Sequence, residues 1–310
     1  MVFIKSGSGG RQSAGYPDGC RNRFLQISVL FLSFDNQKDY FVLSLCRKVS
    51  VWTKLLLCLG SVEYITMKAE KSIYPFRVEP QDVDFTLRAT ISSLGSAVLN
   101  TAGIDAHGKG FGVDALHADN YSWVLSRIAF EFDSRPEQYA DYRIATWISD
   151  YGRVLSTRNF TLCDSSGNEF GRAVSQWAMI DLSTRAAVDL SGVGDAHADA
   201  VVDAPPPAAM PRKIRAVAPS VSCQHRVVYS DIDFNRHVNT MRYIEMMLDM
   251  LPIERLTDGA PMRFDIHFMK ECRYGQTLTV GVEHRDNGAF FEIAGDEGAA
   301  AVRAAIEWPQ

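Results

Sequence analysis

The sequence predicts an α+β protein in which one plan, a helix embraced by the antiparallel sheet that follows it, occurs twice. Two segments with helical spacing of apolar residues are each preceded by one extended segment and followed by several strand-like segments. A proline-rich run, DAPPPAAMP at 203–211, separates the two series. Because proline cannot continue a helix or a central strand, this run predicts a semi-rigid linker between two halves.

The composition favours a folded protein of two moderate domains. The chain has 310 residues, with an ordinary apolar fraction of 46% and charged fraction of 22%. A net charge of -5 gives no overall basic surface, so nucleic acid is not expected as a partner. The six cysteines form no CxxC pair and no regular framework, which favours free thiols in a reducing cytoplasm.

The beginning of the chain differs from the rest. Charged residues interrupt its apolar runs before membrane-spanning length, and the opening MVFIKSGSGG lacks the apolar stretch of a secretory signal. No membrane span is therefore expected, and a cytoplasmic location is the default. Residues 1–66 follow neither a helical nor a strand period, so this extension is assigned no fold. Met67 opens a polar start that leads into a strand, which favours Met67 as the natural initiator; a genuine extension is the alternative.

The first half, residues 67–204, is expected to form an amino-terminal domain. An extended segment at 76–83 precedes a short helix that Ser92 or Ser93 caps and Gly103 closes. The segments that follow are rich in β-branched and aromatic residues, which is typical of strands. These strands are expected at 123–132, 142–149, 154–163 and 170–181.

Residues 205–211 are the predicted linker, and residues 212–310 are expected to form the second domain. An extended segment at 224–229 precedes a helix whose apolar residues recur every three or four positions between Val238 and Leu251. This helix is expected to be longer and more apolar than the first. Strands are expected at 262–270, 277–283, 289–293 and 300–308. A sheet that wraps one central helix is a hot-dog domain, so the sequence predicts two tandem hot-dog domains.

The densest polar cluster, SDIDFNRHVN at 230–239, lies at the amino terminus of the second helix. Asp233, Asn235 and His237 alternate along it, so their side chains are expected to share a cleft. Helix-end amides can stabilise an oxyanion there, and histidine titrates near neutral pH. The alternative is that the acidic and amide residues only cap the helix. Because Asn239 adds a further polar group, the cluster exceeds what one cap requires, which favours a catalytic function.

A second pair of reactive residues, Glu271 and Cys272, ends the strand expected from residue 262. The carboxylate can serve as a base toward water, and the thiol can serve as a nucleophile near an imidazole. An inert buried thiol is the alternative for Cys272. Among the possible metal ligands in this half, such as His267, the spacing matches no zinc pattern, so no metal is expected.

The cluster resembles the signature of the acyl-ACP thioesterases of plants and bacteria, which runs much like DxDxNxHVNNxxY. Residues 231–243 read DIDFNRHVNTMRY here, and the likeness extends over roughly residues 70–308. Thr240 and Arg236 depart from the pattern. The resemblance implies two tandem hot-dog domains, the first mainly forming the acyl-chain pocket and the second carrying catalysis.

The resemblance also implies roles for particular residues. Asp233, Asn235, His237, Glu271 and Cys272 fall on the family's catalytic network. Trp123 and Arg127 fall on a central strand of the substrate-pocket half.

The implied activity is hydrolysis of fatty acyl-ACP to free fatty acid and ACP, terminating fatty acid synthesis. The partner is acyl carrier protein with its 4′-phosphopantetheine-linked acyl chain, and no cofactor is needed. Glu271 or Asp233 would activate water while His237 shuttles a proton; the rival mechanism makes Cys272 the nucleophile. An acyl-CoA thioesterase and a non-catalytic acyl-binding sensor are the alternatives, and a monomer or homodimer is expected. ACP is acidic, so a local basic surface is expected, with Arg212, Lys213, Arg215, Arg242, Lys270 and Arg273 as candidates.

Overall fold

The computed structural model describes residues 27–34, 37–44 and 69–309. The chain divides into two units, Met1–Met67 and Lys68–Gln310, which are described separately. In the first unit, β1 (Ile27–Phe34) and β2 (Gln37–Ser44) pair in antiparallel fashion. Met67, the predicted initiator, lies outside the described residues.

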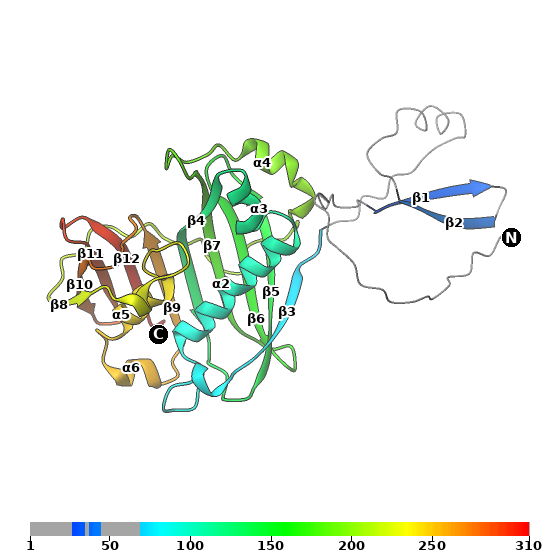
Figure 1. The fold of residues 1–310 in the computed structure, drawn as a ribbon. Coiled ribbons are helices and arrows are strands. Elements are labelled where there is room, and N and C mark those ends of the chain that lie inside the picture. The colour runs from blue at the N-terminus through cyan, green and yellow to red at the C-terminus, as the bar shows by residue number, and fades with distance from the viewer. Residues whose placement is uncertain (1–26, 35–36, 45–68, 310) are drawn as a thin grey trace, which may run out of the picture. The chain divides into compact units, whose positions relative to one another are not determined.

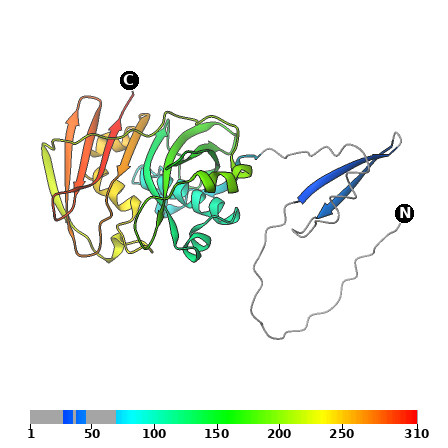
Figure 2. The same ribbon diagram turned by 90° about the horizontal axis from the view of Figure 1, so that it is seen from above.

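Within residues 69–309, ten strands form one sheet in the order β3-β5-β6-β7-β4-β9-β12-β11-β10-β8 (Figures 1 and 2). The strands of the first half are β3 (Ser72–Arg77), β4 (Tyr121–Phe132), β5 (Asp141–Tyr151), β6 (Ser156–Asp164) and β7 (Glu169–Asp181). Those of the second half are β8 (Val221–Arg226), β9 (Met262–Phe268), β10 (Thr277–Arg285), β11 (Gly288–Ala294) and β12 (Ala300–Glu307). Read inward from the two edges, both halves follow the same strand order. The prediction of an α+β fold with two tandem hot-dog domains is confirmed. The five strands of each half join edge to edge into one sheet where β4 pairs with β9.

The central helix of the first half is α2 (Ile91–Gly108), and the structure corrects both of its predicted ends. Thr90, rather than Ser92 or Ser93, caps it, because the Thr90 hydroxyl accepts the amide of Ser93 at 3.0 Å. The helix also continues past Gly103, since burial of Ala102, Asp105 and Ala106 outweighs the low helix propensity of one glycine.

The central helix of the second half, α5 (Thr240–Leu248), is shorter than α2, so the expectation of a longer helix was wrong. Val238 and Leu251 lie outside the helix but are buried, so packing rather than helical geometry explains their spacing. The two central helices contact each other at Gly95: a Cβ there would lie 3.0 Å from the Met241 sulfur. Glycine at this position therefore allows α2 and α5 to approach closely.

Three short helices complete this unit and were not predicted. They are α3 (Val113–Ala118), α4 (Ser191–Ala196) and α6 (Ile253–Thr257). Each has only five or six residues, too few for a helical period to show in the sequence. No helix in the described part of the chain has the length and hydropathy that a membrane crossing requires.

The first strand of each half ends earlier than predicted. Two short 3₁₀ turns, η1 (Pro80–Asp82) and η3 (Tyr229–Asp231), take the place of the expected strand ends. Pro80 has no amide to donate to a sheet, and Asp82 accepts the amide of Glu79 at 2.9 Å. These turns lead the chain out of the sheet and toward the start of each central helix.

The predicted linker lies against the face of the sheet that points away from α2 and α5. The Arg212 amide donates to Asp265 of β9 at 2.9 Å, and the Arg263 guanidinium donates to the carbonyls of Ala209 and Met210, each at 3.2 Å. Trp147 of β5 donates to the carbonyl of Ala204 at 3.3 Å. These contacts fasten the linker across the junction of the two halves. The domain boundaries expected at residues 204 and 212 stay predictions.

Candidate active site

The loop between β8 and α5 holds three of the predicted catalytic residues, and a buried carboxylate anchors its start. Asp231 accepts the Val228 amide at 2.9 Å, His225 at 2.8 Å and the Arg242 guanidinium at 3.0 Å. Burial works to raise the pKa of Asp231, but these hydrogen bonds outweigh it and lower the pKa. The carboxylate therefore stays ionised and holds the loop against the sheet and the helix.

The Asp233 side chain organises the tip of the same loop. One carboxylate oxygen accepts the amides of Asn235 at 2.8 Å and of His237 at 3.2 Å. The Asp233 amide donates in turn to the His237 carbonyl at 2.9 Å, and Arg236 adopts a positive φ of 64°. The chain thus makes a tight turn that leaves Asn235 exposed and returns His237 toward the sheet.

His237 and Glu271 meet across this turn. Their Nε2 and Oε2 atoms lie 3.2 Å apart, and 17% and 32% of the two side chains are exposed. The backbone of His237 forms a bridge with that of Arg273, which fixes the loop beside the segment that carries Glu271. A carboxylate and an imidazole at this distance can exchange a proton, and both remain accessible to a ligand.

A second cation reaches the same carboxylate oxygen of Glu271. The Arg185 guanidinium donates to Oε2, the atom that also faces His237. Arg185 belongs to the turn after β7, so it comes from the first half of the chain. The prediction from sequence missed it, because a single arginine in a loop gives no signal of a contact formed 86 residues further along.

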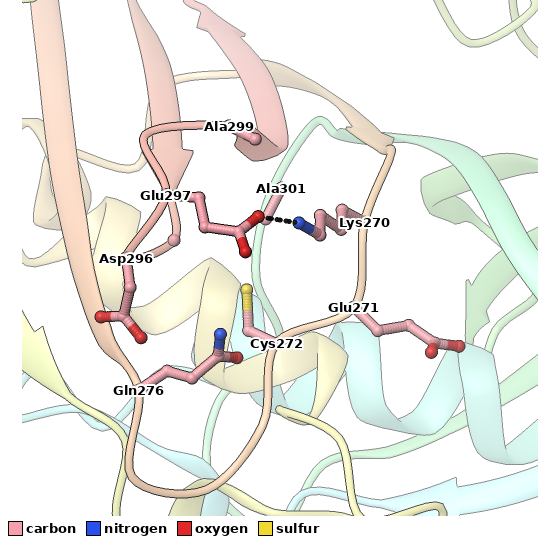
Figure 3. Close-up of a pocket in the computed structure, with 9 residues that line it drawn as sticks. Lys270, Glu271, Cys272, Gln276, Asp296, Glu297, Ala299 and Ala301 are labelled. Carbon is pink, nitrogen blue, oxygen red and sulfur yellow. Dashed lines mark hydrogen bonds and ion pairs between the residues drawn. The ribbon is translucent and has the colours of Figure 1, made fainter.

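Cys272 faces the opposite way from its neighbour. Its thiol points toward the ion pair of Lys270 and Glu297 in a small pocket, whereas the Glu271 carboxylate points away from that pocket (Figure 3). Only 2% of Cys272 is exposed. Burial raises the pKa of the thiol, against an opposing effect of the Tyr243 hydroxyl. The structure therefore brings His237 and Glu271 together but does not bring the thiol to the imidazole.

Trp123 and Arg127 lie on opposite faces of β4. The strand has an irregularity in register between Leu125 and Arg127. Trp123, two residues before buried Leu125, donates to the carbonyl of Phe111 at 3.3 Å on the helix side. Arg127 lies opposite His267 on the other face, and its Nε has no hydrogen-bond partner within residues 69–309. The substrate-binding roles of both residues stay predictions.

The loop before α2 has the same backbone frame as the loop before α5. Asp84 accepts the Thr86 amide at 2.8 Å, as Asp233 accepts that of Asn235. The Asp84 amide donates to the carbonyl of Arg88 at 3.0 Å, matching the bond from Asp233 to His237. The residues before Arg88 and His237 both have positive φ, at 58° and 64°. The repeated Asp-Phe pairs at 84–85 and 233–234 are the sequence signal of this duplication.

The chemistry of the two loops differs although the frame is shared. Thr86 and Arg88 stand where the second half has Asn235 and His237. The Ala89 amide donates to the carbonyl of Pro136, and the Val238 amide donates to the carbonyl of Cys272 in the same way. Pro136 therefore corresponds to Cys272, and the residue before it, Arg135, corresponds to Glu271. The shared aspartates therefore support the loop, and the positions that differ distinguish the second half as the candidate active site.

Comparisons with known families agree with this twofold architecture. A family model of the acyl-ACP thioesterase N-terminal domain matches residues 70–192. A model of the acyl-ACP thioesterase C-terminal domain matches residues 215–310. The chain belongs to the acyl-ACP thioesterase family. The predicted family resemblance is thereby confirmed.

Solved structures and curated relatives of this thioesterase family match most of the chain. A crystal structure of an acyl-ACP thioesterase from Bacteroides thetaiotaomicron is 36% identical, with a TM-score of 0.69, and the match covers 77% of this chain and 98% of that one. The 12:0-ACP thioesterase from Umbellularia californica shares the fold, with a TM-score of 0.67 at 17% identity, and the match covers 77% of this chain and 97% of that one.

Among curated relatives, the chloroplastic oleoyl-acyl carrier protein thioesterase of Coriandrum sativum is 25% identical over 247 residues, 73% of this chain. The chain spans 59 to 66% of the length of the first curated relatives that it matches.

The predicted catalytic residues of this family member form one tight cluster and one outlier. Asp233, Asn235 and His237 share the loop before α5, and Glu271 contacts His237. Cys272 is the outlier, since its side chain enters the neighbouring pocket. Within residues 69–309, no three His, Cys, Asp or Glu side chains gather in an arrangement that could hold a metal ion. The catalytic role of each residue stays a prediction.

Proposed function

We propose that this protein hydrolyses fatty acyl-ACP thioesters to free fatty acid and ACP, and so terminates fatty acid synthesis. The observation that supports it is the contact of His237 with Glu271 at the start of α5, in a chain whose two halves match both acyl-ACP thioesterase domain models. The second-half loop has the acid, amide and imidazole that thioester hydrolysis requires, whereas its first-half counterpart does not.

In this proposal Glu271, rather than Asp233, is the base. Glu271 contacts the imidazole of His237 directly, whereas the Asp233 carboxylate accepts only the backbone amides of Asn235 and His237. Glu271 takes a proton from water as the water oxygen attacks the thioester carbonyl carbon. The carbon–sulfur bond then breaks, and the pantetheine sulfur leaves with a proton from His237, which enters the cycle as an imidazolium and becomes a neutral imidazole. Glu271 returns its proton to His237, which restores the starting state.

In this proposal two groups stabilise the oxyanion of the reaction. The Asn235 side chain is exposed at the tip of the loop, where a thioester carbonyl can approach. The positive end of α5 begins after Asn239, four residues further along. Together these donors can stabilise the negative charge that develops on the carbonyl oxygen.

The acyl carrier protein is proposed to dock on the exposed rim around this loop. Of the predicted basic candidates, Arg212, Arg242 and Lys270 already pair with acidic residues. Arg273 is exposed and lies beside His237, and Arg236 is exposed on the loop itself. Exposed aromatic residues complete the rim: Tyr229, Phe234 and Tyr274. An acidic carrier protein fits this combination of positive charge and apolar surface.

Charge reversal tests the docking surface. Arg236→Glu with Arg273→Glu is expected to raise KM for acyl-ACP strongly and leave kcat nearly unchanged, because only the encounter is weakened. Arg143→Glu, which reverses the charge of an exposed arginine of β5 outside this rim, is the control. Added salt should raise KM of the wild-type protein as well. An unchanged KM in the double variant would place the carrier elsewhere.

The decisive measurement of the function is the release of free fatty acid from a panel of acyl-ACP and acyl-CoA thioesters. Wild type is expected to prefer acyl-ACP, and His237→Ala is expected to lose turnover. His284→Ala, which removes an exposed histidine of β10, is the matched control and should keep it. Preference for acyl-CoA would instead indicate an acyl-CoA thioesterase, and binding without turnover an acyl-binding sensor. The cytoplasmic location and the monomeric or dimeric state stay predictions.

A further inference from the structure

The turn after β7 presents Arg185 in a defined position. One Asp181 carboxylate oxygen accepts the amides of Ser183 at 2.9 Å and Thr184 at 2.7 Å, and the Arg185 amide donates to the Asp181 carbonyl at 2.8 Å. A backbone bridge between Ile180 and Ala187 closes the turn. Arg185 itself adopts a positive φ of 60°. The backbone that carries this side chain is therefore held by its own hydrogen bonds, independently of the second half.

The guanidinium of Arg185 contacts the carboxylate that the proposed mechanism uses. It donates to Oε2 of Glu271, which also lies 3.2 Å from Nε2 of His237. The Arg185 side chain is 45% exposed and that of Glu271 is 32% exposed, so the ion pair alone adds little to stability. Its geometry matters more, because a glutamate on three rotatable bonds needs a partner to keep it facing one imidazole.

We propose that Arg185 is a positioning residue that holds Glu271 toward His237, so that the active site requires both halves of the chain. This inference rests on the proposed thioester hydrolysis. The counterpart position supports the need for such a partner. Arg135, which replaces Glu271 in the first half, is likewise tied to the other half: it donates to the Leu256 carbonyl of α6 at 2.7 Å. Each half thus uses this one position, beside its loop, to contact the opposite half.

The test combines truncation with chemical rescue. Arg185→Ala is expected to lower kcat by about tenfold to a hundredfold, because Glu271 loses its orientation, while KM for acyl-ACP stays nearly unchanged. Millimolar guanidinium chloride, far below denaturing concentrations, should restore part of the lost kcat, and Arg185→Lys should keep part of it. Arg153→Ala, which removes the exposed partner of Asp189, is the control and should neither lose kcat nor respond to guanidinium.

The outcomes separate this inference from the proposed function. If wild type and His237→Ala hydrolyse acyl-ACP alike, the proposed site is wrong and Arg185 has no role in it. If His237→Ala is inactive but Arg185→Ala keeps the wild-type kcat, the site stands and the role of Arg185 is rejected. A loss in Arg185→Ala that neither guanidinium nor lysine restores would also reject a positioning role. Thermal unfolding of each variant checks that the fold is intact.

Discussion

Glu271 and Cys272 are adjacent in sequence, yet they lie in different environments. Both residues follow the end of β9 at Phe268 and precede Arg273, whose backbone bridges to that of His237. Glu271 reaches His237 and Arg185, while Cys272 turns into the pocket beside Lys270 and Glu297 (Figure 3). Chemical type alone made both residues candidates for catalysis. Only their direction, which depends on where the strand ends, distinguishes the base from the thiol.

Replacement of the thiol tests this distinction. Cys272→Ala is expected to keep most of the turnover, because the thiol is buried, its pKa is raised and it faces away from His237. Loss of one buried atom should lower the free energy of unfolding by about 1 kcal/mol. Steady-state kinetics and urea denaturation measure the two effects. Abolished turnover with an intact fold, together with an acylated cysteine found by mass spectrometry, would support the nucleophile mechanism instead.

Asp233 offers a second test. Support of the loop requires only an oxygen that accepts hydrogen bonds, whereas action as a base requires an ionised carboxylate. A single oxygen, Oδ1, accepts both backbone amides. Asp233→Asn keeps an oxygen acceptor and should keep substantial turnover, whereas Asp233→Ala should lower kcat about tenfold or more, because the turn that presents His237 loosens. Asp84→Asn in the first-half loop is the matched control and should leave kcat unchanged. An Asn variant as inactive as the Ala variant would indicate that Asp233 is the base.

At the scale of elements, periodic patterns predicted the central helices and the strands, but not their ends. Gly103 suggested a helix end, yet the helix continues because Asp105 and Ala106 are buried against the sheet. Asp105 pairs there with Arg158 of β6 at 2.6 Å, a contact that no local pattern predicts. The sequence prediction also missed that the two loops share a backbone frame. The hydrogen bonds that define this frame go to backbone groups, and most of the side chains in the two loops differ.

Removal of the cap of α2 and removal of the cap of α5 are expected to affect stability alike but activity differently. Thr90→Ala and Asn239→Ala each remove an acceptor of a helix amide, at 3.0 and 2.8 Å. Each is expected to lower the free energy of unfolding by about 1 kcal/mol. Only Asn239→Ala should also lower kcat, because Asn239 ends the loop that presents His237. Urea denaturation and kinetics on both variants provide the check, and an equal loss of kcat in the two would argue against the assignment of catalysis to the second half.

At the scale of the whole sheet, the halves join where β4 and β9 pair, between residues more than a hundred positions apart in sequence. Phe130 and Phe264 lie opposite each other in this pairing and are both fully buried. The strand-like patterns predicted each strand separately but did not predict that strands of the two halves would become neighbours. For the same reason, the linker over this junction and the contact of Arg185 with Glu271 were beyond what the sequence could indicate.

The buried carboxylate of Asp265 fastens this junction, and its removal should destabilise the unit as a whole. Asp265 is fully buried and accepts Nε of both Arg212 and Arg263 at 2.8 Å, while Arg263 also pairs with Glu131 of β4. Asp265→Asn keeps the shape but removes the charge, so each guanidinium group loses one of its two carboxylate partners and keeps the other, Glu307 for Arg212 and Glu131 for Arg263. Since breaking a buried pair is costly, the free energy of unfolding should fall by about 3 kcal/mol.

Urea denaturation followed by tryptophan fluorescence measures this loss. Asp141→Asn, which breaks the exposed ion pair with Arg77, is the control and should leave the midpoint unchanged. If Asp265→Asn unfolds at the wild-type midpoint, the ionic contacts do not hold the junction. The apolar side chains of β4 and β9 would then be sufficient to join the halves, and the linker would only cover them.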